Sequence, residues 1–514
     1  MKKYTSFMLV IALVLWSFLL GTGTATAGEN TTPTDLPPAG VEQPFETPTD
    51  LVSFGDITED GGINAKDALV VLREAVSKCP CFSAHERLIA DVTRDNKINA
   101  QDALEMLKYA VGKPNAIQPM EIKLQTIWPD SYTANTPEAN LWKLGFATAE
   151  ISYGIKTRVE GVDPSTAADT FVKAVMAGRV ETDLMEVSLY TSRELAKKKV
   201  LANLSDSKTL NFNGYNSGVT RGMTFGKKRY GVSLPVYGAE VKGVIYNKEL
   251  IKRYAPNVDI EELYRTKQWT FDTFRDLAKQ CTVDTDGDGK TDIYGVTGNN
   301  QLISLAVASN GGGYAVMNNN RVEDVMFTSL GVTAAQWCKD LYKTDGSWRY
   351  LADLKLVTEQ FAQGKAAMFV TRSYMIQQIG EQAHLEMGFV AMPIGPAQTD
   401  YVDPNDNGVV FIVPRTNEKR LSQVGTWLNA LAVVSQPLVS LELEQMAESG
   451  LDAQGCKNYE ALAHNGTPDY FYGAFSNTVE NTVENIPISD ERKLAVIHQS
   501  VQQELDDFYA SFYE

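Results

Sequence analysis

The chain has 514 residues, of which 44% are hydrophobic and 22% charged, a balance that allows two or three ordinary hydrophobic cores. The formal net charge of -17 argues against nucleic acid or an anionic membrane as a partner. The five cysteines are odd in number and sparse for a chain of this length, which excludes a disulfide framework of the kind found in small secreted domains.

The N-terminus has the pattern of a secretory signal peptide. Lys2 and Lys3 precede an apolar run from Phe7 to Leu20, and Ala25-Thr26-Ala27 provides the small residues of a cleavage site. The run is shorter than the roughly 18 residues that a membrane-spanning helix needs, so a retained anchor is the less favoured alternative. We therefore expect residues 1–27 to be removed and the protein to be secreted and extracellular, with no direct membrane insertion.

Two linkers divide the mature chain. Residues 28–52 are rich in Thr and Pro, and residues 113–120 form a shorter break that also contains proline. Between the linkers lies a small segment, 53–112, and after them a large one, 121–514.

The small segment contains an internal duplication. Residues 55–76 and 90–111 align without gaps at a spacing of 35 residues, and each copy reads as a loop followed by a helix. Oxygen-bearing side chains recur at positions 1, 3, 5, 9 and 12 of a calcium loop, and calcium takes six to eight such ligands. The predicted calcium ligands are Asp56, Thr58, Asp60, Asn64 and Asp67 in the first copy and Asp91, Thr93, Asp95, Asn99 and Asp102 in the second.

Both loops depart from the usual EF-hand. Position 12 is Asp, Asn96 stands where Gly is normal, and the helix before each loop is missing or weak. With these features the segment resembles type I dockerin repeats. The resemblance implies a small α-helical, paired EF-hand-like domain that holds two calcium ions and binds a cohesin module of a scaffolding protein. Residues matching the family's cohesin-binding positions are Ala65, Lys66, Leu72, Arg73, Ala100, Gln101, Leu107 and Lys108.

The alternative to docking is a calcium-stabilised spacer, in which Leu69, Leu72 and Val76 pack as the core of a helix pair. Ala65 and Ala100, where Ser is common in the family, leave the type of cohesin open.

The large segment opens with alternating strand and helix patterns. Residues 122–128 and 155–159 are strand-like, a helix follows the cap Thr136-Pro137-Glu138, and residues 165–177 are amphipathic. This succession predicts a parallel α/β sheet.

A series of local motifs follows, at residues 230–235, 243–250, 269–272, 284–295, 361–369, 389–396 and 411–417. Their order and spacing resemble the extracellular solute-binding proteins of ABC importers, in the maltose-binding-like branch. The resemblance implies an α/β bilobal periplasmic-binding-protein-like fold whose lobes close over a ligand in a cleft. Lobe one would hold about 121–236 and 391–434, and lobe two about 237–390 and 435–514. An ABC importer permease is then a further candidate partner.

Carbohydrate-binding members of such a family stack sugar rings on aromatic faces and hydrogen-bond the hydroxyls with polar side chains. Trp128 ends the first strand at the carboxyl edge where open α/β sheets bind ligands, and Tyr374 stands where relatives commonly have a stacking Trp. Three other tryptophans, Trp142, Trp269 and Trp337, are predicted to pack in the interior. The full set of candidate ligand-binding residues is Trp128, Asp130, Tyr237, Glu240, Tyr314, Arg372 and Tyr374.

A third acidic run lies between a predicted helix and a predicted strand. Asp284, Asp286, Asp288 and Asp292 occupy calcium-loop positions, but position 12 is Gly295. A structural calcium site and a solvated acidic turn remain alternatives here.

No catalytic residue is predicted, because hydrolase motifs such as GxSxG are absent and the four histidines have no metal or triad spacing. We therefore expect a cellulosome-associated, oligosaccharide-binding protein of polysaccharide catabolism rather than an enzyme. The alternatives are a dockerin-borne polysaccharide-degrading enzyme and a structural or adhesion component with a vestigial cleft.

Overall fold

The computed structural model describes residues 54–512, apart from 78–81, 96, 116, 118–119, 216, 235–240, 406–407 and 471–489. The predicted signal peptide, the linker 28–52, Asn96 and the candidate ligand residues Tyr237 and Glu240 lie outside the described residues. The chain divides into two compact units, one made of Met1–Met120 with Ala147–Ile155 and the other of Glu121–Phe146 with Lys156–Glu514.

The first unit is built on the duplicated segment. Helices α2 (Ala65–Val76) and α4 (Ala100–Ala110) follow the two loops, and a short helix, α3 (Ala84–Ala90), precedes the second loop. Asn64 and Asn99 each begin a long helix with a capping box, which the Asp three residues later completes. The loop-then-helix prediction is therefore confirmed for both copies.

The core of this unit uses equivalent residues of the two copies. Ala68 and Val71 of α2 are buried, and so are Ala103 and Met106 of α4, each 35 residues further on. Small residues at the first of these positions allow the two helices to pack closely together.

The first unit also contains residues 147–155, which the sequence assigned to the large domain. The Phe54 N–H donates to the Ile151 carbonyl at 3.0 Å, and the Arg94 guanidinium donates to the Tyr153 and Gly154 carbonyls at 3.1 and 2.8 Å. Gly154 has a φ of +58°, and a Cβ there would lie 2.6 Å from the Phe54 ring, so glycine is required. The boundary expected at residue 121 is thus too simple, because this later segment bonds to the N-terminal one.

The first sheet of the second unit has four strands in the order β14-β3-β1-β2. Strands β1 and β3 are parallel, as expected, and β14 is antiparallel to β3. The strands are β1 (Met120–Thr126), β2 (Ile155–Gly161), β3 (Leu184–Ser188) and β14 (Val409–Ile412). The nearby helices are α5 (Asp130–Thr133), α6 (Pro137–Tyr153), α7 (Ala167–Met176), α8 (Leu189–Lys197), α9 (Ser217–Gly222) and α17 (Leu421–Val434), with a short hairpin, β4 (Thr224–Phe225) and β5 (Lys228–Arg229), and 3-10 turns at 204–206, 212–214 and 415–420.

The second sheet has five strands in the order β10-β7-β11-β6-β12, with β6 antiparallel to both neighbours. Every residue of β6 is buried, as in sheets covered by helices on both faces. The strands are β6 (Lys242–Asn247), β7 (Tyr294–Gly298), β10 (Trp348–Tyr350), β11 (Ala366–Arg372) and β12 (Met387–Val390). The helices of this lobe are α10 (Lys248–Tyr254), α11 (Ile260–Arg265), α12 (Phe271–Gln280), α13 (Gln301–Gly311), α14 (Ser329–Lys339), α15 (Leu354–Ala362), α16 (Met375–Gln382), α18 (Gln436–Glu448) and α19 (Ala453–Asn465), together with a π-helical turn at 340–344 and the small pairs β8 (Ala315–Asn318) with β9 (Arg321–Asp324) and β13 (Pro404–Asn405) with β15 (Thr467–Pro468).

The chain returns to lobe one later than expected. The Trp269 indole N–H donates to the Ala391 carbonyl at 3.0 Å, and the Tyr401 hydroxyl donates to the Tyr264 carbonyl at 2.7 Å. Residues 391–401 therefore stay with lobe two, and only β14 rejoins the first sheet. The boundary at 391 is corrected to a point after Tyr401. A further passage lies at Ser435, between α17 and α18.

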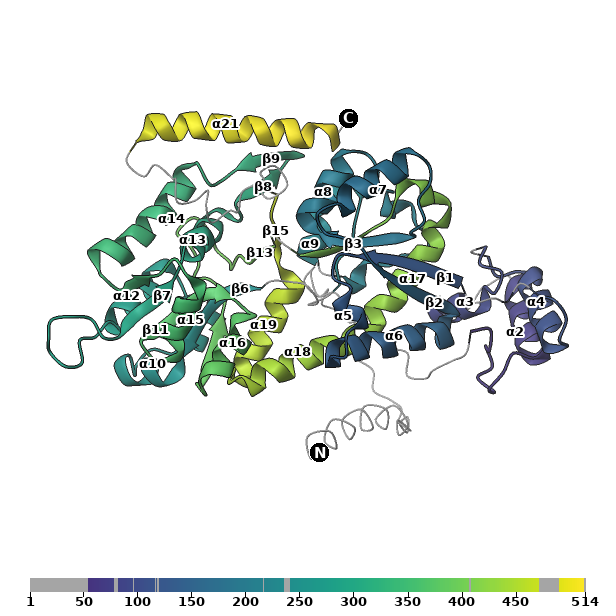
Figure 1. Cartoon of the computed structure of the whole chain (residues 1–514), viewed down its shortest axis with the longest axis horizontal. Helices are drawn as coiled ribbons and strands as arrows, with labels where there is room; N and C mark the ends of the chain where they lie inside the picture. The colour runs from purple at the N-terminus through teal and green to yellow at the C-terminus, as the bar shows by residue number, and fades with distance from the viewer. Residues whose placement is uncertain are drawn as a thin grey trace, which may run out of the picture. The chain divides into compact units, whose positions relative to one another are not determined.

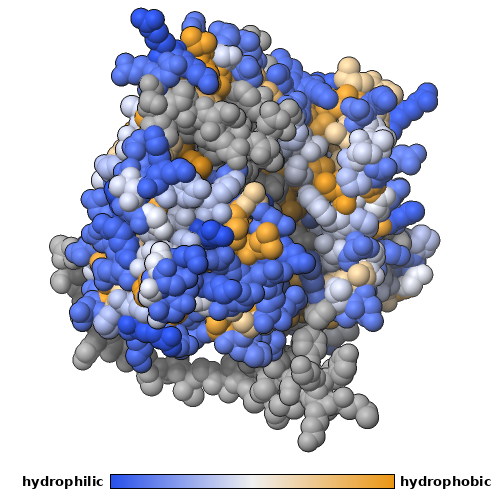
Figure 2. Space-filling view, turned by 60° about the vertical axis from the view of Figure 1, so that its left-hand side comes forward, coloured by the Kyte–Doolittle hydropathy of each residue, from blue (hydrophilic) through white to orange (hydrophobic). Residues whose placement is uncertain are grey.

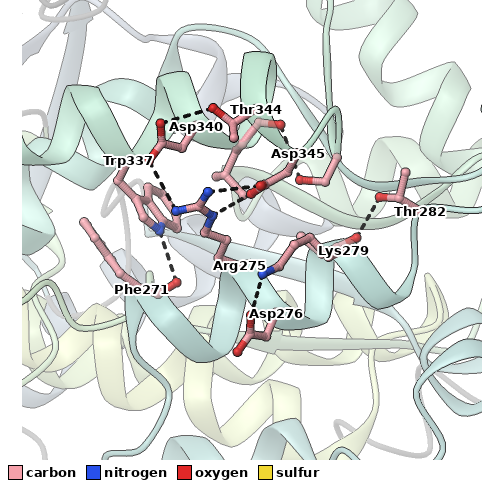
Figure 3. A network of polar contacts seen from close by, with 12 residues as sticks. Phe271, Arg275, Asp276, Lys279, Thr282, Trp337, Asp340, Thr344 and Asp345 are labelled. Atoms are coloured by element: carbon pink, nitrogen blue, oxygen red, sulfur yellow. Dashed lines mark hydrogen bonds and ion pairs between the residues drawn. The ribbon is translucent and has the colours of Figure 1, made fainter.

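Buried aromatic rings and half-buried charged groups join α12 to α14 and to the turn that follows α14 in lobe two (Figure 3). The Arg275 guanidinium makes two bonds to Asp345, at 2.5 and 3.0 Å, and one to Asp340 at 3.2 Å. Beside it, the Trp337 indole N–H donates to the Phe271 carbonyl at 3.1 Å. The interior placement predicted from the sequence is confirmed for Trp142, Trp269 and Trp337.

The C-terminal helix α21 (Glu491–Tyr509) runs along both lobes of the second unit (Figure 1). On lobe two, His498 Nδ1 lies 2.7 Å from an Asp324 carboxylate oxygen. Beyond the helix, in the 3-10 turn 510–512, Phe512 stacks on Phe225 of lobe one with ring centroids 4.0 Å apart. One face of the helix is apolar and packs inward, since Val501, Leu505 and Phe508 are buried.

In the part of the chain that the structure describes, no helix has both the length and the apolar character needed to cross a membrane. Figure 2 shows a face on which hydrophilic residues predominate and hydrophobic residues form small separate groups. Scattered groups of this size do not by themselves mark a binding surface.

Candidate functional site

The first calcium loop brings its acidic side chains together. Carboxylate oxygens of Asp56, Asp60 and Asp67 lie within 4.8 Å of one another. Asp67 is buried and accepts hydrogen bonds from the backbone N–H groups of Thr58 and Asn64, at 2.9 and 2.8 Å. These bonds fold the loop back on the start of α2, which places the carboxylate of Asp67 beside those of Asp56 and Asp60.

The second loop repeats the hydrogen bonds that the first loop makes to its last Asp. Asp102 is buried and accepts from the Thr93 hydroxyl at 2.8 Å and from the Asn99 N–H at 2.9 Å. Asp91 accepts from the backbone N–H of Asp95 at 3.1 Å. Burial raises the pKa of Asp102.

Both loops fit calcium by the chemistry of their donors. They present hard oxygen atoms at the spacing of a calcium loop, and two of the carboxylates, Asp67 and Asp102, are fully buried. The charge nearest the first loop is Lys66, whose Nζ lies 2.9 Å from Asp60. A divalent ion would balance the clustered negative charge far better than this exposed lysine.

The third acidic run lies between α12 and β7, as predicted, and carboxylate oxygens of Asp284, Asp286 and Asp292 lie within 4.8 Å of one another. Hydrogen bonds from the Gly289 and Gly287 backbone lower the pKa of Asp284, and those from Thr285 lower the pKa of Asp292. The fourth candidate, Asp288, pairs instead with Lys290 at 2.9 Å.

The outer faces of α2 and α4 carry apolar side chains that do not enter the core. Leu72 and Leu107, at equivalent positions, are 40% and 43% exposed. The spacer alternative placed Leu69, Leu72 and Val76 in the core, whereas all three are exposed because the core uses the neighbouring helix positions, which point to a different side. Of the residues at the cohesin-binding positions, seven are exposed, namely Ala65, Lys66, Leu72, Arg73, Ala100, Gln101 and Leu107, and Lys108 is half-buried.

In the second unit, each lobe places an aromatic ring after an inner strand. Trp128 follows β1 and is 37% exposed, and Tyr374 follows β11 and is 39% exposed. Both stand at the carboxyl ends of parallel strands, where open α/β sheets bind ligands.

The other candidate ligand residues differ in their surroundings. Asp130 is exposed at the start of α5, and Arg372 is half-buried at the end of β11. Tyr314 is only 1% exposed and belongs to the main hydrophobic core, and its backbone N–H donates to Asp469. The structure thus places Tyr314 in the interior, where the Gly312-Gly313 turn directs it, and not on an accessible surface.

One buried acid near Trp128 was not anticipated. Glu186 lies in the apolar strand β3 and accepts hydrogen bonds from Thr126 and Tyr132 at 2.5 and 2.8 Å. Burial raises its pKa to about 7. In the sequence, Glu186 is a single Glu inside the run Leu184–Ser188. Such a residue has the same pattern as a strand position that faces solvent, so the sequence alone does not predict its burial.

Two α/β lobes, each with a partly exposed aromatic ring beyond the carboxyl end of an inner strand, define a two-lobed α/β fold, and a separate small module carries the paired acidic loops. The chain belongs to the bacterial extracellular solute-binding protein family, whose model matches residues 134–431. Residues 54–111 match the dockerin type I domain, so the N-terminal module is a dockerin.

Solved structures show the same fold. UspC from M. tuberculosis is 18% identical, with 75% of this chain and 100% of that chain covered and a TM-score of 0.55. A cyclo/maltodextrin-binding protein complexed with maltotetraose is 16% identical, with 77% and 97% covered and a TM-score of 0.52. No curated protein matches the chain in sequence.

Proposed function

We propose that this protein is secreted, captures an oligosaccharide between its two lobes, and attaches through its dockerin to a cohesin of a scaffolding protein. Held among polysaccharide-degrading enzymes, it would meet released sugars at high local concentration. The captured sugar would then pass to an ABC importer permease or be retained near the cell surface.

The observation that carries the sugar proposal is the pair of rings, Trp128 and Tyr374, one on each lobe. A sugar has apolar C–H faces and a polar rim, so a site for it combines aromatic faces with side chains that bond hydroxyls. Asp130 and Arg372 stand near the two rings in the sequence and supply an acceptor and a donor. The similarity to a protein complexed with maltotetraose agrees with this ligand class.

The dockerin proposal is supported by the exposed leucines on α2 and α4. Calcium bound in the two loops would balance their carboxylates and so order the starts of both helices. Leu72 and Leu107 would then be presented on equivalent faces to a cohesin. A third ion at Asp284, Asp286 and Asp292 would have a structural role in lobe two.

Isothermal calorimetry of the mature chain against a panel of malto-, cello- and xylo-oligosaccharides tests the sugar proposal. We expect saturable binding that weakens about tenfold in Trp128→Ala and in Tyr374→Ala, the loss of one stacked ring. Tyr342→Ala is the matched control, since Tyr342 is a similarly exposed ring, at 43%, that packs against Trp348 and Tyr350 in lobe two.

Two other results would contradict the proposed sugar-binding function and favour one of the alternatives. Release of reducing ends from a polysaccharide by the purified chain would favour the enzyme alternative. Binding of cohesin without binding of any sugar in the panel would favour a structural or adhesion component.

A further inference from the structure

Glu186 holds both ends of the short segment that carries Trp128. It is fully buried on β3, and its cross-strand neighbour on β1 is Thr126, whose hydroxyl donates to one carboxylate oxygen at 2.5 Å. The hydroxyl of Tyr132, on α5, donates to the other carboxylate oxygen at 2.8 Å. Residues 127–131 therefore form a loop that is tied at each end to one side chain.

The hydrogen-bond chain continues to Trp128 itself. The Trp128 backbone N–H donates to the Thr126 hydroxyl oxygen at 2.9 Å. A hydroxyl has one proton to donate and two lone pairs to accept with, so donation to Glu186 leaves the Thr126 lone pairs free to accept from Trp128. On the other side, the Tyr132 ring is packed against Trp142 and Phe146, with centroids 5.3 and 5.8 Å away.

The carboxyl group is costly to bury at this place. Its two described donors, Thr126 and Tyr132, are neutral hydroxyls, and burial raises the pKa of Glu186 to about 7. An apolar side chain would fill the same space without that cost. Buried polar networks, when fully satisfied, fix one arrangement of the groups that they join.

We infer that Glu186 is a positioning residue of the ligand site, which holds the Trp128 ring at the sheet edge in the orientation that stacks on a sugar. The inference rests on the proposed function and adds to it the residue that orients the aromatic face. Its effect on affinity comes from preorganisation, because a ring held in place loses less freedom when ligand binds.

A double-mutant cycle tests this role by calorimetry with maltotetraose, cellotetraose and xylotetraose. We expect Glu186→Ala to weaken binding about fivefold, and to add less than about twofold when Trp128 is already Ala, because it acts through that ring. Glu186→Gln should restore affinity to within about twofold of wild type, since an amide can accept from one hydroxyl and donate to the other.

The matched control is Glu261→Ala. Glu261 on α11 also has its pKa raised by burial and also accepts from a tyrosine hydroxyl, that of Tyr246 on β6 at 2.6 Å, but neither residue is a candidate ligand residue or adjoins one in the sequence. Affinity should be unchanged in this variant. An effect of Glu186→Ala equal to that of Glu261→Ala, or fully additive with Trp128→Ala, would overturn the inference while leaving the proposed function in place.

A ligand-free measurement separates the two proposals further. With 5-fluorotryptophan incorporated, the ¹⁹F signal of Trp128, assigned by its loss in Trp128→Phe, should shift or broaden in Glu186→Ala and stay unchanged in Glu261→Ala. An unchanged Trp128 signal in a folded Glu186→Ala variant would refute positioning. If the wild type binds none of the three sugars, the proposed sugar function fails, whereas the fluorine signal still decides the role of Glu186.

Discussion

Replacing Glu186 by Gln should remove one component of the pH dependence of stability. The pKa of Glu186 is raised from 4.5 to about 7 by burial, so the folded state binds this proton more tightly than the unfolded state does. Below pH 4.5 the group is neutral in both states, and above pH 7 it is charged in both. The free energy of unfolding of the wild type therefore falls as pH rises between these values.

The size of this change in stability follows from the shift in the pKa of Glu186. At about 1.4 kcal/mol for each pKa unit, a rise from 4.5 to about 7 corresponds to about 3 kcal/mol. Because Gln does not titrate, the stability of Glu186→Gln relative to wild type should increase by this amount between pH 4 and pH 8. Other buried acids such as Asp324 and Glu442 also have raised pKa values, but they titrate equally in both proteins. Their contribution is removed when the wild-type stability is subtracted from that of the variant at each pH.

Urea titrations followed by circular dichroism, at fixed calcium and over this pH range, measure the difference. If the stability difference between Glu186→Gln and the wild type does not change with pH, the pKa of Glu186 is near its ordinary value. If the difference decreases as pH rises, a cation stabilises the charged carboxylate. Either result would refute the account of Glu186 as a carboxyl held by hydroxyl groups alone.

Three further predictions concern other parts of the molecule. Asp102→Asn should reduce calcium bound by the dockerin loops from two ions to one in calorimetry, and should cost the module about 4 kcal/mol of stability at calcium near 1,000 times its Kd. In a pull-down with a type I cohesin, Leu72→Asp combined with Leu107→Asp should abolish capture, since burial of each leucine is worth about 2 kcal/mol, and each single change should leave the equivalent face available. Arg275→Lys should lower the stability of lobe two by about 1–2 kcal/mol, because lysine cannot make the paired bonds to Asp345, whereas Arg265→Lys, in an exposed pair, should change it by less than about 0.5 kcal/mol in the same denaturation assay.

The features that sequence predicted well are those set by local pattern. The duplication predicted a loop followed by a helix in each copy, and the structure has α2 and α4 at these places. Strand β1 and helix α6 follow from periodicity and from Pro137 at the first helical position. These signals act within one loop or one helix, so no knowledge of the rest of the chain is needed.

The features that sequence missed depend on contacts between distant segments. Nothing local shows that Ala391 will accept a bond from Trp269, and this bond keeps the chain in lobe two beyond the expected passage. The sequence alone does not distinguish Tyr314 from Tyr374 as candidate ligand residues. In the structure, Tyr314 packs in the core and Tyr374 remains partly exposed. Glu186 is recognised only when Thr126 and Tyr132 are brought to it from other elements.

The two candidate sites should respond to acid in opposite directions. Calcium ligands must be deprotonated to bind the ion, so falling pH weakens calcium binding by the dockerin loops and with it the presentation of their cohesin faces. Glu186 has no cation beside it among its described partners, and its protonation relieves the cost of burial, so lobe one gains stability as pH falls. Protonation of Glu186 below about pH 7 therefore favours the folded state of lobe one, whereas protonation of the loop carboxylates would weaken calcium binding and the proposed attachment to a cohesin.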